Sequence, residues 1–173
     1  MEAEEIARLL NAQPLIGSAA TESAVVAALP NARIVHLATH GFLSDFGTGI
    51  PGALALAPSA TDDGLLTARE IFNLRLNAEL VALSACDTGR GTITGDGVIG
   101  LSRAFITAGV PSLLVSLWAV PDAPTQELTV EFYRQLETHP DKARALRQAM
   151  LHMMQKYPKP RDWGAFILVG TAE

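Results

Sequence analysis

The sequence is poor in several features, and each scarcity excludes a class of protein. One cysteine in 173 residues cannot form an internal disulfide, so nothing demands an oxidising compartment. The formal net charge is −5 and the 13 lysines and arginines form no run, which argues against nucleic-acid binding. No apolar stretch approaches the length that crosses a membrane, and the acidic start lacks the layout of a secretory signal. We therefore expect a cytoplasmic globular protein that binds neither nucleic acid nor membrane.

Apolar residues are plentiful, at 49% of the chain, and they gather in short runs. Continuous apolar runs that alternate with helical patterns indicate a mostly parallel sheet with helices on both faces. Strands are predicted at 14–18 (a short edge strand), 32–38, 53–57, 79–85, 111–118 and 163–170, with the rest of 41–64 and all of 87–97 as loop. Helices are predicted at 3–11, 22–29, 98–109, 123–137 and 141–156. Thr21 and the "TARE" capping box at 67–70 should begin helices, and Gly109 should end one.

Two chemistry-bearing residues follow predicted strands. His40 follows the end of the run at 32–38, and Cys86 follows the end of the run at 79–85. In parallel sheets sites gather at the carboxyl ends of strands, so these side chains could meet there if the strands are neighbours. A histidine can activate a thiol, and the backbone N–H groups of Gly41 and Cys86 could hold an oxyanion. The alternative is that Cys86 is a buried, inert thiol.

The other histidines and carboxylates indicate structural roles. His36 lies mid-strand, and alternation puts it on the same face as His40; we interpret it as a hydrogen-bonded core residue. His139 and His152 are interpreted as surface or packing residues, and Asp62 and Asp63 as turn residues. No metal site is predicted, because the chain lacks histidine and cysteine ligands at a suitable spacing.

Two other site motifs fit poorly. "GDGVIG" at 95–100 matches the G-x-G-x-x-G pattern of dinucleotide sites, and Asp122 follows at a suitable distance. However, a Rossmann glycine turn follows its strand immediately, and here Ala85 to Gly95 intervene. A Cys-x5-Arg phosphatase loop is excluded because Thr92 stands where the arginine would be.

Several blocks together resemble one family. "HLATHGF" at 36–42 and "LSACDTG" at 83–89 resemble the signature blocks of the CHAT domain, a caspase-like cysteine peptidase family often joined to tetratricopeptide repeats. Further blocks resemble its later segments in the same order, so the likeness covers nearly the whole chain. They are "ATESAV" at 20–25, "GLLTAREI" at 64–71, "GDGVIGLSRAFITAGVPSLLVSLWAVPD" at 95–122, "EFYRQL" at 131–136, "ARALRQA" at 143–149 and "WGAFILVG" at 163–170.

The resemblance implies a fold and a chemistry. The fold is the caspase-like three-layer α/β sandwich, in which the histidine strand and the cysteine strand are adjacent. The chemistry is cysteine endopeptidase cleavage of a protein substrate by a dyad of His40 and Cys86, with Gly41 at the oxyanion-hole position. It implies no third catalytic residue and no cofactor. A tetratricopeptide-repeat region or a regulatory protein is the expected partner, and activity could be latent until it acts.

Two departures from the family pattern carry consequences. The family's first strand is not matched, so we expect residues 1–173 to form one domain that is the C-terminal part of a longer domain or protein. The edge of the histidine strand should then be open. Ser84 stands where enzymes that cut after arginine or lysine carry an acid, so no basic cleavage preference is predicted. A non-catalytic scaffold or signalling module remains the alternative function.

Overall fold

A computed structural model describes residues 1–42, 44, 46–84 and 95–173, with the backbone alone for 95–98. Its main sheet has the strand order β1 (Ile34–Leu37), β5 (Leu80–Leu83), β6 (Ser112–Ser116) and β7 (Phe166–Gly170). β1, β5 and β6 run parallel, and β7 joins antiparallel. The sheet is therefore mostly parallel, and β1 lies at its edge as the sequence predicts.

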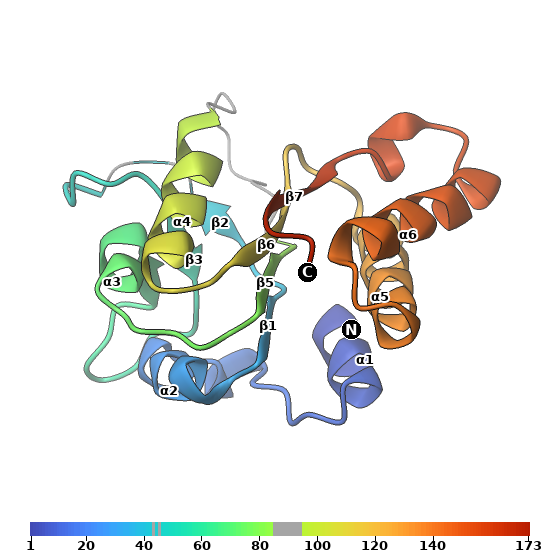
Figure 1. The fold of residues 1–173 in the computed structure, drawn as a ribbon. Helices are drawn as coiled ribbons and strands as arrows, with labels where there is room; N and C mark the ends of the chain where they lie inside the picture. The colour runs from blue at the N-terminus through green and yellow to red at the C-terminus, as the bar shows by residue number, and fades with distance from the viewer. Residues whose placement is uncertain (43, 45, 85–94) are drawn as a thin grey trace.

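Helices cover both faces of this sheet (Figure 1). One face carries α2 (Glu22–Ala28), α3 (Ala68–Phe72) and α4 (Gly95–Thr107), and the other carries α1 (Glu2–Leu9), α5 (Asp122–Thr138) and α6 (Lys142–Lys156). Short 3-10 turns lie at η1 (Gly17–Ala19), η2 (Leu29–Asn31) and η3 (Pro160–Asp162). The result is the three-layer α/β sandwich that the sequence implied.

The strands are apolar throughout because they contribute to two cores. In β5, Val81 and Leu83 pack toward α2, α3 and α4, whereas Leu80 and Ala82 pack toward α1, α5 and α6. All four side chains are at most 5% exposed. A strand with one face in water would alternate apolar and polar residues; burial on both faces removes that alternation.

A small second sheet lies on the α3 and α4 side, with the order β2 (Gly41–Phe42), β3 (Ala53–Ala55) and β4 (Leu65–Thr67). Its strands pair antiparallel. Leu54 and Leu66 are fully buried against the core that α3 and α4 share. This sheet fixes the segment that follows β1, which is the segment that carries His40.

Three sequence predictions about elements are wrong. Residues 14–18 form no strand: Pro14 lacks an N–H, and Gly17 takes a left-handed backbone (φ 56°) that starts η1. The region 41–64 is not loop apart from 53–57, because Gly41–Phe42 forms β2. Residues 95–97, predicted as loop, are the first residues of α4.

The predicted helix signals are confirmed. The Thr21 and Thr67 side chains cap α2 and α3, and Thr67 forms its capping box with Glu70. Gly109 follows α4 with a φ of 113°, a conformation that suits glycine.

Candidate active site

β1 and β5 are parallel neighbours, so both strands end at the same end of the sheet. They pair in parallel, with Leu37 opposite Leu83. Beyond the strands, the Ser84 N–H donates to the Leu37 carbonyl at 3.3 Å. His40 is the third residue after Leu37 in the sequence, and Cys86 is the third after Leu83.

His40 is held by its backbone at the start of the small sheet. The Ala55 N–H donates to the His40 carbonyl at 2.8 Å, and the Thr39 hydroxyl donates to the Ala55 carbonyl. Its side chain is exposed, whereas Gly41 is buried. The imidazole therefore lies on an accessible surface while the main chain around it is fixed.

The pairing also orients the Gly41 N–H. Gly41 lies opposite Leu54, and its neighbour His40 directs its carbonyl to β3. Successive residues of a strand direct their backbone groups to alternate edges, so the Gly41 N–H points away from β3. β2 is the edge strand of this sheet. A backbone donor next to His40 is thus directed away from its own sheet.

Cys86, and with it the second predicted oxyanion donor, lies outside the described residues, as do residues 87–94 of the predicted loop. Ser84 is the last described residue before it. The Ser84 side chain is buried at 8% exposure, and its hydroxyl has no hydrogen-bond partner among the residues that the structure describes.

His36 is a core histidine, as predicted. Its side chain is 6% exposed; Nε2 lies 3.1 Å from the Glu2 carboxylate, and Nδ1 lies 3.2 Å from the Tyr133 hydroxyl. The Thr129 hydroxyl donates to the same Glu2 oxygen at 3.0 Å. Burial and the Glu2 carboxylate raise the pKa of Tyr133, so its side chain stays a phenol. Since β1 ends at Leu37, strand alternation does not extend from His36 to His40.

The carboxylates of the 59–65 turn have the structural roles expected of them. The Ser59 hydroxyl donates to Asp62 at 2.8 Å, and the Leu65 N–H donates to Asp63 at 2.9 Å. Within the described ranges, histidine, cysteine and acidic side chains do not gather in groups that could hold a metal ion.

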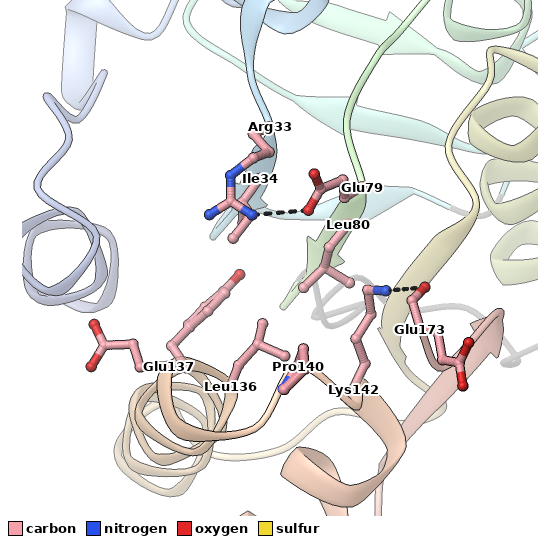
Figure 2. A pocket seen from close by; sticks show the side chains of 10 residues that line it. Arg33, Ile34, Glu79, Leu80, Leu136, Glu137, Pro140, Lys142 and Glu173 are labelled. Atoms are coloured by element: carbon pink, nitrogen blue, oxygen red, sulfur yellow. Dashed lines mark hydrogen bonds and ion pairs between the residues drawn. The ribbon is translucent and has the colours of Figure 1, made fainter.

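A cavity of about 210 Å³ lies at the opposite end of the sheet (Figure 2). Ile34 and Leu80, the first residues of β1 and β5, line it, whereas His40 follows the other end of β1. Two polar contacts border it: Arg33 with Glu79 at 2.9 Å, and Lys142 with the Glu173 carbonyl at 2.6 Å. This cavity is therefore separate from the candidate active site.

The last glycine of "GDGVIG" has a packing reason. Gly100 lies within α4, and a Cβ built on it would lie 1.9 Å from the Pro51 carbonyl oxygen. Only glycine permits this approach between α4 and the segment before β3. The match to a dinucleotide motif therefore has a structural explanation at this position.

The layers, the parallel β1–β5–β6 core and the histidine beyond β1 define a caspase-like α/β fold. The chain belongs to the CHAT domain family, whose model matches residues 1–171. Tetratricopeptide repeat protein 28 of Mus musculus and of Homo sapiens are each 33% identical to it over 204 residues. These alignments cover 98% of this chain but 8% of each relative. In the described part of the chain, no helix has both the length and the apolar composition of a membrane span.

Proposed function

We propose that this domain is a caspase-type cysteine endopeptidase that hydrolyses peptide bonds of a protein substrate with His40 and Cys86. Membership of the caspase-like CHAT family supports this reaction class. The proposal includes a cytoplasmic setting, where a single thiol stays reduced. It also includes regulation by a tetratricopeptide-repeat region or another protein, since the relatives are named for such repeats.

The observation that carries the proposal is the register of β1 and β5. Leu37 and Leu83 lie opposite each other in parallel strands. Because neighbouring strands lie about 4.8 Å apart, segments of equal length beyond this pair begin side by side. In the sequence, His40 is three residues after Leu37 and Cys86 is three residues after Leu83. The Gly41 N–H, which points away from β3, is the proposed oxyanion donor next to His40 in the sequence.

The proposed reaction is acyl transfer. His40 takes the proton of the Cys86 thiol, and the thiolate attacks the peptide carbonyl carbon, forming a C–S bond. The N–H groups of Gly41 and Cys86 stabilise the negative oxygen. The C–N bond then breaks, and His40 gives its proton to the leaving amine. Water attacks the thioester, releases the carboxylate product and restores the thiol.

Alkylation of Cys86 by iodoacetamide tests the dyad without a known substrate. A thiol with an ordinary pKa is about 3% thiolate near pH 7, whereas one lowered to about 7 is half thiolate. We therefore expect Cys86 to react roughly ten times faster than a free thiol, and His40→Ala to remove that advantage. His152→Ala, an exposed histidine on α6, is the matched control and should keep the wild-type rate. If Cys86 is alkylated at the same rate in the wild type and in His40→Ala, the dyad is contradicted.

A non-catalytic scaffold is the second candidate function. The observation in its favour is that the relatives bear the name of a repeat, and that this chain spans 8% of their length. A scaffold needs no activated thiol. It predicts that Cys86 reacts with iodoacetamide only when the protein unfolds, in both the wild type and His40→Ala.

A further inference from the structure

Two exposed aromatic rings lie close to the candidate catalytic histidine in the sequence, one at the end of β2 and one just beyond it. Phe42 ends β2, and Phe46 follows in the segment toward β3; their ring centroids lie 6.0 Å apart at an interplanar angle of 78°. Phe42 is 36% exposed and Phe46 is 42% exposed. Three other phenylalanines of the chain, at 105, 132 and 166, are at most 2% exposed. The pair is therefore not part of either core.

Described residues near the pair make contacts of their own. The Gly52 N–H donates to the Ser44 carbonyl at 3.1 Å, which closes the segment at the base of β3. The Arg69 guanidinium of α3 donates to the Thr48 carbonyl. The close approach of α4 at Gly100 fixes its far end. Backbone groups of Ser44, Thr48 and Gly52, which are near the two rings in the sequence, are therefore held by hydrogen bonds.

Strand geometry puts Phe42 on the same face as His40. The Ala55 N–H donates to the His40 carbonyl, one residue before β2, which continues the register of β2 with β3 by one residue. Side chains two positions apart in a strand emerge on one face, about 7 Å apart. The exposures agree with this: His40 and Phe42 are exposed, and Gly41 between them is buried. An apolar surface therefore begins beside the imidazole.

We infer that Phe42 and Phe46 form a specificity subsite, which binds a bulky apolar side chain of the peptide next to the scissile bond. This inference rests on the proposed peptidase function and names its substrate class. An aromatic or large aliphatic side chain would cover the exposed ring faces and remove apolar surface from water. A charged or small side chain at that substrate position gains nothing there.

A random-sequence peptide library, read by mass spectrometry, tests the subsite on both sides of the cleaved bond. The wild type should prefer phenylalanine, leucine or methionine at one position flanking the bond. The double variant Phe42→Ala/Phe46→Ala should lose about tenfold in kcat/KM for those peptides, and little for peptides with alanine there. Phe46→Ala alone, which leaves β2 intact, should lose part of the preference. Phe72→Ala is the matched control, since Phe72 is also 42% exposed but ends α3.

Iodoacetamide separates the two possible failures, because so small a reagent does not need the subsite. Fast alkylation of Cys86 in the wild type and in the double variant, with the lost preference, supports the subsite. Three outcomes overturn the subsite when alkylation is fast: the double variant keeps the wild-type preference, the wild type shows no apolar preference, or no peptide is cleaved. Each of them leaves the activated thiol supported. Slow alkylation that is independent of His40 overturns the proposed function, and the subsite with it.

Discussion

Replacing His36 with alanine should destabilise the fold strongly, although the residue is only four positions from His40. The imidazole joins three elements: β1 carries it, α1 supplies Glu2, and α5 supplies Tyr133. Its removal leaves the Tyr133 hydroxyl, on a residue 1% exposed, without its His36 contact. Each buried polar group that loses its partner costs about 1–3 kcal/mol. The Glu2 carboxylate keeps the Thr129 hydroxyl as a donor, so its loss is smaller.

The sum for His36→Ala is a loss of about 3 kcal/mol in the free energy of unfolding. Urea unfolding followed by far-ultraviolet circular dichroism measures it, with the slope of the transition as a check on two-state behaviour. Tyr133→Phe keeps the buried ring and removes one hydrogen bond, so it should cost about 1 kcal/mol. His152→Ala, on an exposed residue, should change stability by less than about 0.5 kcal/mol. A His36→Ala midpoint equal to that of His152→Ala would refute the reasoning.

Two further predictions concern packing and charge. Gly100→Ala should lower stability by about 2 kcal/mol or more, because its Cβ would overlap the Pro51 carbonyl oxygen; an unchanged melting temperature would contradict that approach. The Lys156 ammonium, 2.7 Å away, and the Tyr157 hydroxyl hold the pKa of Glu127 below its usual value. A carboxyl whose folded pKa is lowered stabilises the fold above its unfolded pKa, and that contribution disappears as pH falls through the folded pKa. Glu127→Gln should thus be less stable than wild type near neutral pH, and the difference should shrink from about pH 6 to about pH 3; a constant difference argues against the pairing.

The main sheet was predictable because its strands are buried on both faces. Residues 79–85 and 111–118 contain uninterrupted apolar runs, and runs of this kind identify parallel strands without any alignment. Capping at Thr21 and Thr67 was equally visible, because an N-cap depends on a local side-chain contact. The prediction of an edge strand at 14–18 was wrong for a local reason too. It relied on the apolar residues of this segment and gave too little weight to Pro14 and Gly17, which disfavour a strand.

The small sheet was harder to predict because its strands are too short to show a period. Gly41–Phe42 is a strand only through its pairing with β3, a contact made across a separation of more than ten residues. The exposure of Phe42 and Phe46 could not be predicted either, because the two residues are not part of a periodic hydrophobic pattern. What the sequence did supply at this end of the sheet was residue chemistry: the positions of His40 and Cys86 relative to the runs that precede them.

The block "HLATHGF" contains two histidines in opposite surroundings: the His36 side chain is buried in the core, and His40 is exposed. His36 lies within β1, where its ring must satisfy both nitrogens inside the core, and does so with Glu2 and Tyr133. His40 lies beyond the end of β1, where the residue is exposed and its carbonyl accepts a hydrogen bond from Ala55. A catalytic imidazole must exchange protons with a substrate, which a buried and bonded ring in the core cannot do. Hence a change at His36 should act on stability and leave the alkylation rate of Cys86 in the folded protein unaltered, whereas a change at His40 should act on that rate and leave stability nearly unaltered.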